Sequence, residues 1–264
     1  MDATVGIVIP AYRPSPDRLA TFIAGIRREI DPDRIHVELD VPTPDVIRTI
    51  ERTDATLRVA DHRRGKGAAI TAGFERLGTG VLAFADADGS TSPAALATVL
   101  DPVCAGEADL AVGSRRHPDA VVTAHQSRLR RRLGDAFPRV ARRLLPVDLY
   151  DYQCGAKAID AGLWRSIRST LVSPGFAWDI EFLVAAASAG ATIREVPISW
   201  EDRPGSTVDT AGTVLAFGRS FIRIRARAHT APVASLVDAL LPSTPPLVSR
   251  PSILGRPPPD RGIE

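Results

Sequence analysis

The first hundred residues alternate short, β-branched apolar segments with stretches whose apolar residues recur at helical spacing. Each apolar segment has the length of a strand, and each is followed by a helical stretch. This alternation predicts βαβ units, and therefore a mostly parallel sheet with helices on both faces. The expected strands are Val5–Ile9, Ile35–Asp40, Leu57–Ala60 and Val81–Ala85, and the helices between them are Asp17–Ile30, Asp45–Arg52 and Lys66–Leu77.

The second half of the chain continues the alternation less regularly. We expect one catalytic α/β domain over residues 1–210, with a Rossmann-like sheet flanked by helices. Residues 211–230 are predicted to form a basic amphipathic helix. Residues 231–264 are predicted to be a flexible tail, since Pro232–Glu264 holds eight of the 22 prolines. The further elements expected are strands Asp109–Val112, Cys154–Ala158 and Thr192–Val196, helix Asp179–Ala189, and a basic helical stretch, Gln126–Leu145.

Composition removes several classes of protein. With 44% hydrophobic residues in 264, the chain can bury a sizeable core. A net charge of +2 and 5% aromatic residues argue against nucleic acid as a partner. The two cysteines show no metal-site or disulfide spacing, which fits a reducing cytosol. The longest charge-free runs have 12 residues, fewer than the roughly 20 that a membrane-spanning helix needs. We therefore expect a cytoplasmic protein that does not cross a membrane.

The strongest local motif is FADADGST at residues 84–91. A hydrophobic strand there delivers two carboxylates, Asp86 and Asp88, to a point where the chain turns. Oxygen ligands of this kind suit Mg²⁺ or Mn²⁺, which also bind substrate phosphates. The alternative is a plain turn in which Ser90 or Thr91 caps a helix that begins at Pro93.

A second motif, RRGKGAA at residues 63–69, follows the third expected strand. Its glycines would let backbone N–H groups approach an anion, and the helix N-terminus and the cations would reinforce that attraction. It is neither a Walker A loop nor a dinucleotide fingerprint. A tight turn without ligand is an equally good interpretation of the motif alone.

Four later segments carry polar residues that, taken singly, fit capped turns or surface ion pairs. No nucleophile elbow is present, and the five histidines show no metalloprotease spacing. The segments are GSRRH (113–117), DYQCGAK (151–157), GFAWDIE (175–181) and WEDRPGS (200–206).

In combination, the motifs resemble those of glycosyltransferase family 2. The chain is most similar to the branch of dolichyl-phosphate β-glucosyltransferases and dolichol-phosphate mannosyltransferases. Seven motifs, the six above and VIPAY at residues 8–12, follow the family's order within residues 5–207. Their DADG-S/T, D-x-QCG-x-K and W-x-x-x-PGS forms resemble the glucosyl type more than the mannosyl type. The chain departs from the family pattern at Arg13-Pro14, where N-E is usual, and at residues 38–42, where DDGS is usual.

The resemblance implies a GT-A-type fold and a metal-dependent, inverting transfer of a hexose to a polyprenyl or dolichyl phosphate. The donor would be a nucleotide diphosphate sugar, with UDP-glucose favoured, and the cofactor Mg²⁺ or Mn²⁺. The lipid-linked product would serve protein or surface glycosylation. In this sequence the metal pair would be Asp86 and Asp88, and the catalytic set Asp88, Asp179, Arg115 and Arg203. The donor would contact Pro10, Tyr12, Asp40, Arg64, Lys66, Asp86 and Gln153, the first two beside the nucleobase.

The chemistry expected of such a site needs no strong general base. A phosphate monoester has a second pKa of about 6, so the acceptor is already a nucleophile at neutral pH. Asp179 is therefore expected to contact a sugar hydroxyl rather than to accept a proton. Lys66, an arginine and the metal would neutralise charge on the leaving nucleotide.

Two basic segments are candidates for peripheral contact with an anionic membrane, on its cytoplasmic face. One is the cluster of arginines between residues 128 and 143, and the other is the helix expected within residues 211–228. Both could equally be solvated faces that cover the core.

Other functions remain open at this stage. The alternatives are a GDP-mannose-dependent dolichyl-phosphate mannosyltransferase, a sugar nucleotidyltransferase, or a module that binds anionic lipid or nucleic acid. A nucleotidyltransferase should carry a glycine-rich loop directly after its first strand, where this chain reads PAYRP. A binding module would leave the DADG element and the PGS loop unexplained.

Overall fold

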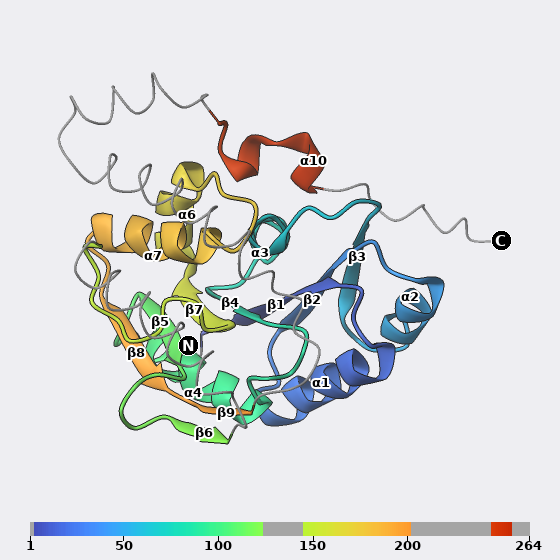
Figure 1. The fold of residues 1–264 in the computed structure, drawn as a ribbon, viewed down its shortest axis with the longest axis horizontal. Coiled ribbons are helices and arrows are strands. Elements are labelled where there is room, and N and C mark those ends of the chain that lie inside the picture. The colour runs from blue at the N-terminus through green and yellow to red at the C-terminus, as the bar shows by residue number, and fades with distance from the viewer. Residues whose placement is uncertain (1–2, 124–144, 202–243, 255–264) are drawn as a thin grey trace, which may run out of the picture.

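The computed structural model describes residues 3–123, 145–201 and 244–254. A seven-stranded sheet with the order β3-β2-β1-β4-β7-β5-β8 forms the middle layer (Figure 1). The predicted mostly parallel sheet is confirmed, because every neighbouring pair except those made by β7 runs parallel. The strands are β1 (Val5–Tyr12), β2 (Arg34–Asp40), β3 (Thr56–Ala60), β4 (Val81–Ala85), β5 (Leu110–Ser114), β7 (Ala156–Asp160) and β8 (Ile193–Pro197).

Strand β7 runs antiparallel between β4 and β5. Its register pairs Phe84 with Lys157 and Ala85 with Ala156. The start of β7 therefore lies at the same edge of the sheet as the carboxyl end of β4. A second, two-stranded parallel sheet joins β6 (Val121–Thr123) to β9 (Ser199–Glu201).

Helices cover both faces of the seven-stranded sheet, because its strands alternate with helices along the chain and carry apolar side chains on both faces. One face packs against α1 (Pro16–Glu29), α2 (Pro44–Ile50) and α4 (Pro93–Cys104). The other packs against α3 (Lys66–Phe74), α6 (Ala161–Ile167) and α7 (Trp178–Ser188), with η1 (Arg168–Thr170) after α6. None of the helices in the described ranges is long and apolar enough to cross a bilayer.

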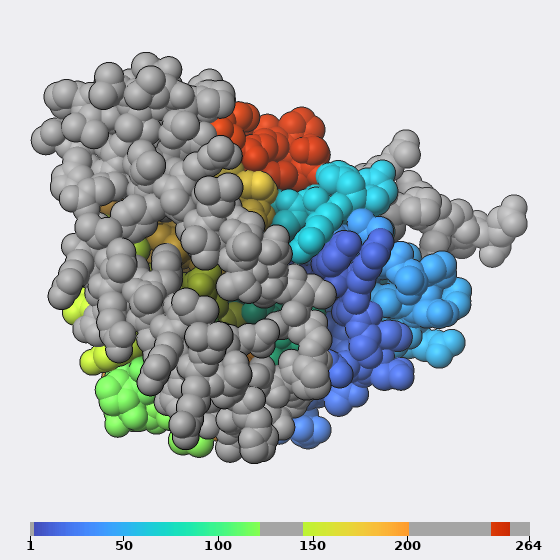
Figure 2. All heavy atoms as spheres, in the orientation of Figure 1, coloured from blue at the N-terminus to red at the C-terminus, as the bar shows by residue number. Residues whose placement is uncertain are grey.

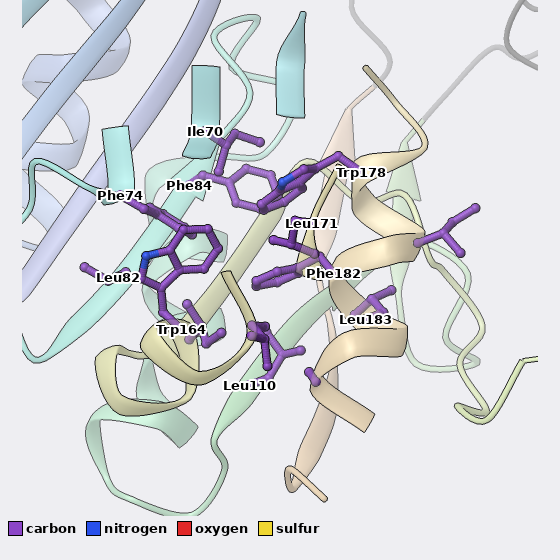
Figure 3. Packing of buried hydrophobic residues seen from close by; sticks show 14 of the residues in the cluster. Ile70, Phe74, Leu82, Phe84, Leu110, Trp164, Leu171, Trp178, Phe182 and Leu183 are labelled. Carbon is purple, nitrogen blue, oxygen red and sulfur yellow. The ribbon is translucent and has the colours of Figure 1, made fainter. Parts of the chain in front are cut away.

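Aromatic rings fill the core between β4 and the α3, α6 and α7 layer (Figure 3). Trp178 stacks on Phe182, with ring centroids 4.6 Å apart, and meets Phe84 edge-on at 5.8 Å. Phe74 meets Trp164 edge-on at 5.0 Å. These contacts fix α7 against the sheet and so set the position of the residues in its first turn.

Several predicted boundaries differ from the structure. The helix predicted over residues 66–77 ends at Phe74. The helix that begins at Pro93 is capped by Ser92, which accepts a hydrogen bond from the Ala95 N–H, so the alternative in which Ser90 or Thr91 is the cap is wrong. Thr91 instead forms an isolated β-bridge with Trp200. The helix predicted over residues 211–228 and nearly all of the 126–145 stretch lie outside the described residues.

Residues 244–254, here called the C-terminal strap, pack onto the α3 side of the molecule and include η2 (Leu247–Ser249) and α10 (Pro251–Leu254). They fall within the stretch predicted to be a flexible tail. Leu247 is fully buried, and its N–H donates a 2.8 Å hydrogen bond to the Leu171 carbonyl. Arg250 donates to the Val172 carbonyl, and Ile253 is also buried. Figure 2 shows the red strap beside the cyan surface around α3.

Because Leu247 is fully buried, Leu247→Ala is expected to lower the free energy of unfolding by about 2–5 kcal/mol. Urea titration followed by circular dichroism measures this change. Val121→Ala is the matched control, since Val121 is 60% exposed and its truncation should change stability by less than about 0.5 kcal/mol. A Leu247→Ala variant as stable as the control would show that the strap contributes nothing to the core.

Candidate active site

The candidate site lies at the carboxyl edge of the sheet, where the parallel strands β1 to β4 end (Figure 1). Tyr12 and Asp40 are paired at the ends of β1 and β2. Asp86 follows β4 directly, and Lys66 opens α3 after the loop that follows β3. In open α/β sheets this edge is where ligands bind.

Four charged side chains of alternating sign form a row from the sheet interior to the site. Lys157 Nζ lies 2.6 Å from Asp179 Oδ1, and the other oxygen of Asp179 lies 3.6 Å from Lys66 Nζ. Lys66 Nζ in turn lies 2.9 Å from Asp86 Oδ1. The side chains of Lys157 and Asp179 are 1% exposed and that of Asp86 is 37% exposed, so only the last member meets solvent freely.

The local sequence explains how these groups meet. Side chains alternate along β4, so Leu82 and Phe84 face α3 and α7, and Asp86 continues on their side. Lys157 lies opposite Phe84 in the register, with its ammonium 5.4 Å from that ring. Gly67 allows α3 to approach α7, because a Cβ there would lie only 2.3 Å from the Cβ of Trp178.

The charges of the row change each other's pKa. Burial lowers the pKa of Lys66, but Asp179 and Asp86 outweigh it and raise that pKa above its ordinary value. Burial raises the pKa of Asp86, and Asp88 and Asp179 add to the effect, while Lys66 opposes it. Two ammonium groups thus face three carboxylates, and the excess of negative charge favours binding of a cation.

Asp86 and Asp88 are two carboxylates that could supply oxygen donors to a hard divalent cation. The Asp88 carboxylate accepts a hydrogen bond from the Ser90 N–H at 2.9 Å, which orients it within the turn. Gly155 gives the Asp86 carboxylate its space, since a Cβ at Gly155 would lie 2.1 Å from Oδ2. Residues 3–123, 145–201 and 244–254 contain no group of three or more acidic, histidine or cysteine ligands. A cation held by this pair would therefore take its remaining ligands from water and from substrate.

Arg115, just after β5, forms a bidentate ion pair with Asp151. The Nε and Nη2 atoms of Arg115 lie 2.7 and 3.0 Å from the two carboxylate oxygens, and its guanidinium lies 5.5 Å from the centre of the Trp200 ring. Glu195 accepts hydrogen bonds from the N–H groups of Tyr150 and Asp151, which fixes the loop. Burial would raise the pKa of Asp151, but Arg115 outweighs it and lowers that pKa to about 2.

This lowered pKa predicts a pH-dependent contribution to stability. A carboxyl group whose pKa falls from 3.8 to about 2 on folding stabilises the protein above pH 4 and loses that contribution as the pH falls toward 2. The difference between the two pKa values corresponds to about 2 kcal/mol at neutral pH. The stability margin of the wild type over Asp151→Asn should therefore shrink by about 1 kcal/mol between pH 5 and pH 3.

Urea unfolding of both proteins at the two pH values measures this margin. Asp151→Asn serves as its own control, because it cannot titrate at this position. A margin that stays constant with pH would contradict the assignment of the ion pair as a source of stability.

Arg64 is buried in a second network, away from solvent. Its backbone N–H and Nε each donate a 2.7 Å hydrogen bond to Asp40, and its Nη2 lies 2.8 Å from Glu38 Oε2. Its Nη1 donates to the Ile253 carbonyl of the C-terminal strap at 2.9 Å. Burial would raise the pKa of Glu38, but His36 and Arg64 outweigh it and hold that pKa below its ordinary value.

The Tyr12 ring lies close to two arginines at the end of β1. The guanidinium carbons of Arg63 and Arg13 are 4.4 and 5.3 Å from its centre. Pro10, two residues earlier on β1, is partly buried. Gln153 is also partly buried, and its N–H donates to Asp151.

The structure brings Lys66 into direct contact with Asp86 and close to Asp179, and Asp88 interacts electrostatically with Asp86. Asp40 and Arg64 contact each other. Arg203 lies outside the described residues. Sequence reasoning missed Lys157, Asp151 and Glu38 as members of the buried ion pairs. The sequence did contain a signal for Lys157, since Lys66 and Lys157 are the only lysines among 33 basic residues. In the structure both ammonium groups lie within 4 Å of the Asp179 carboxylate.

Comparison with protein families decides the relationship. The family model described as "Glycosyl transferase family 2" matches residues 6–162, more than half of the chain. The chain belongs to glycosyltransferase family 2. The expected resemblance is therefore confirmed, and the match includes the RRGKGAA, FADADGST and DYQCGAK motifs.

Several curated proteins resemble this family 2 chain, and two of the three described here carry a polyprenol or a dolichyl phosphate in their names. It is 30% identical to glycosyltransferase AglD of Haloferax volcanii over 229 residues, 83% of this chain and 36% of that protein. It is 35% identical to polyprenol monophosphomannose synthase of Mycolicibacterium smegmatis, over 63% of this chain and 60% of that one. Dolichyl-phosphate beta-glucosyltransferase of Dictyostelium discoideum is 30% identical, over 62% and 51%. The chain thus spans about a third to three fifths of these relatives' lengths.

Solved structures confirm the GT-A-type fold of the chain. Glucosyl-3-phosphoglycerate synthase of Mycobacterium tuberculosis, crystallised with Mn²⁺, UDP-glucose and phosphoglyceric acid, matches with a TM-score of 0.64 at 16% identity, over 84% of this chain and 80% of that one. Mannosyl-3-phosphoglycerate synthase of Rubrobacter xylanophilus matches with a TM-score of 0.64 at 17% identity, over 86% and 74%. At these identities the likeness concerns the fold.

Proposed function

We propose that this protein transfers a hexose, glucose in the first instance, from a nucleotide diphosphate sugar to a polyprenyl or dolichyl phosphate, with inversion at the anomeric carbon. The observation that carries the proposal is the row Lys157–Asp179–Lys66–Asp86 at the carboxyl edge of the sheet, with Asp88 beside it. It offers an ammonium and a pair of carboxylates at one point, which suits a diphosphate bound together with a divalent cation. The lipid-phosphate acceptors in the names of the curated relatives support the acceptor class.

On the donor side, the strand ends supply the contacts. Pro10 and Tyr12 would border the nucleobase, with the Tyr12 ring as the flat surface. Asp40, buried at the end of β2, would hold the Arg64 loop beside the donor, and Lys66 would contact the donor phosphates. Arg64 would act as a positioning residue, because its guanidinium is already committed to Asp40, Glu38 and the strap.

Mg²⁺ or Mn²⁺ held by Asp86 and Asp88 would neutralise the charge that develops on the leaving nucleoside diphosphate. Lys66, which pairs with Asp86 at 2.9 Å, would contribute a second positive charge to the same neutralisation. Gln153 completes the donor set from the loop that Asp151 orders.

On the acceptor side, the nucleophile would be a phosphate oxygen. Arg115 and Arg203 would attract this dianion and orient it, and the Asp151 pair holds the Arg115 side chain in place for that task. The acceptor needs no deprotonation, since its second pKa is about 6. Asp179, whose side chain is 1% exposed between two lysines, would act through Lys66, which it holds in place. One in-line displacement would invert the sugar.

An assay of donor choice tests the proposal. The protein is incubated with Mg²⁺, dolichyl phosphate and labelled UDP-glucose or GDP-mannose, and the lipid fraction is analysed for labelled sugar. We expect glucosyl lipid from UDP-glucose. Mannosyl lipid from GDP-mannose as the main product would overturn the choice of glucose in favour of the mannosyltransferase, which the 35% identity to a polyprenol monophosphomannose synthase also supports. No lipid-linked product from either donor would overturn the proposal.

A lipid acceptor requires access to a membrane, and we propose that this access is peripheral, on the cytoplasmic face. In this proposal residues 1–210 form the catalytic domain and the basic residues 211–230 contact anionic lipid, followed by the tail 231–264. Replacing Arg219, Arg223, Arg225 and Arg227 together by glutamine should reduce flotation with anionic vesicles and leave the melting temperature unchanged. Undiminished flotation of this variant would assign membrane contact to another part of the chain.

A further inference from the structure

Lys66 occupies the carboxylate that the proposed function assigns to the metal. Its Nζ lies 2.9 Å from Asp86 Oδ1, while Asp86 Oδ2 lies against the backbone of Gly155. Both oxygens of this ligand therefore already have neighbours in the protein. An ammonium at hydrogen-bond distance and a divalent cation repel each other when they share one carboxylate.

We propose that Lys66 is an internal counter-cation that competes with the divalent metal for Asp86 and turns to the donor diphosphate when the metal binds. The inference rests on the proposed function, since it assumes that Asp86 is a metal ligand. In addition, competition between Lys66 and the metal for Asp86 would make the binding of metal and donor cooperative.

Other groups around Lys66 can still stabilise its positive charge if it moves away from Asp86. Asp179 Oδ2 is 3.6 Å from Nζ, so a second carboxylate remains close. The rings of Phe84 and Phe176 lie 5.3 and 6.0 Å from the ammonium, within the range of cation–π attraction. The side chain is a flexible four-carbon stem with a compact charge, which an arginine fork would not match.

Lys157 makes this movement energetically reasonable. It pairs with Asp179 at 2.6 Å and so neutralises part of that carboxylate's charge. Asp179 therefore does not hold Lys66 as strongly as an unpaired buried carboxylate would. Lys66 is left with two partial attractions rather than one dominant partner, and an arriving diphosphate can outweigh both.

The effect of the Lys66 charge on metal binding therefore depends on whether the donor is bound. Without donor, the Lys66 charge opposes the metal at Asp86. With donor, the same charge pairs with the diphosphate, which stabilises the bound donor and leaves Asp86 to the metal. Because coupling is reciprocal, the metal must strengthen donor binding by the same factor as the donor strengthens metal binding.

Mn²⁺ binding to the full chain, followed by the electron paramagnetic resonance signal of free Mn²⁺, tests the proposal without measuring activity. Titrations are run with and without UDP-glucose for the wild type, Lys66→Met and Lys66→Arg. We expect Lys66→Met to bind Mn²⁺ alone about tenfold more tightly than the wild type. Its gain in Mn²⁺ affinity on adding UDP-glucose should be at least about tenfold smaller. Lys66→Arg, which keeps the charge, should stay near the wild type for Mn²⁺ alone.

Two further variants keep the outcomes distinct. Arg63→Met removes a positive charge from the same loop, but from a residue that faces Tyr12, and it should leave Mn²⁺ binding without donor unchanged. Equal or weaker binding of Mn²⁺ alone by Lys66→Met would overturn the proposal. So would tightening by Arg63→Met as large as that by Lys66→Met, since bulk charge would then explain both. Asp86→Asn is titrated with Mn²⁺ in the presence of UDP-glucose. If this variant then binds Mn²⁺ as tightly as the wild type does under the same conditions, the proposed metal site is wrong, and this inference is wrong with it.

Discussion

Asp86→Asn is expected to lower the rate of sugar transfer by about 10³-fold, the largest effect on activity predicted for a single side chain here. Asparagine keeps the shape of the side chain but removes the charge that faces Lys66 and that would hold the cation. The backbone contact between the Asp86 N–H and the Gly155 carbonyl is unaffected, so the turn after β4 should persist. Initial rates at saturating donor, with Mn²⁺ varied over a wide range, measure the loss.

Asp61→Asn is the control for this prediction. It also removes a carboxylate, but the Asp61 side chain lies in the loop after β3 and is 98% exposed. Its rate should stay within about twofold of the wild type. Higher Mn²⁺ should not restore Asp86→Asn. If the variant retained more than a tenth of the wild-type rate, Asp86 would not carry the charge neutralisation assigned to it.

The largest expected effect on stability is at Lys157. Lys157→Met leaves Asp179 in the protein interior without its closest partner, and the free energy of unfolding should fall by about 3–5 kcal/mol. The double variant Lys157→Met with Asp179→Asn removes both charges and should recover most of this loss. Urea titrations of the wild type, both single variants and the double variant give the coupling energy directly.

Arg194→Met is the matched control for Lys157→Met. Arg194 pairs with Glu107 on the surface, where both side chains are more than half exposed, so its loss should cost no more than about 1 kcal/mol. A Lys157→Met variant as stable as this control, or a double variant no better than the single one, would contradict a buried charge pair.

The sheet could be predicted because its strands carry their own signals. β1, β2, β3 and β4 are apolar, β-branched and separated by amphipathic helices, and each strand lies where the pattern places it. The short elements β6, β9 and α6 have no such pattern, since three residues cannot show a period and α6 begins directly after β7. Their positions depend on contacts made by other parts of the chain.

The candidate site was predicted residue by residue but not as a set of contacts. Lys66, Asp86 and Asp179 were each named from their motifs, yet their meeting depends on the register of β7 beside β4 and on the packing of Trp178 over Gly67. Arg64 shows the same limit. Its motif suggested a donor contact, and only the tertiary structure reveals that a carbonyl at the far end of the chain binds its guanidinium.

That last contact bears on how the protein reaches its working form. The Arg64–Ile253 hydrogen bond spans 189 positions, and contacts with such separation form late because a long loop must first close. The sheet can assemble from residues up to Pro197 before the strap packs against it. The Arg64 guanidinium can therefore pair with Asp40 and Glu38 first and bind the Ile253 carbonyl of the strap only afterwards. By the same reasoning the loop that carries Arg64 opens before the sheet does in local unfolding. We therefore expect the contact between this loop and the strap to be among the last to form in folding.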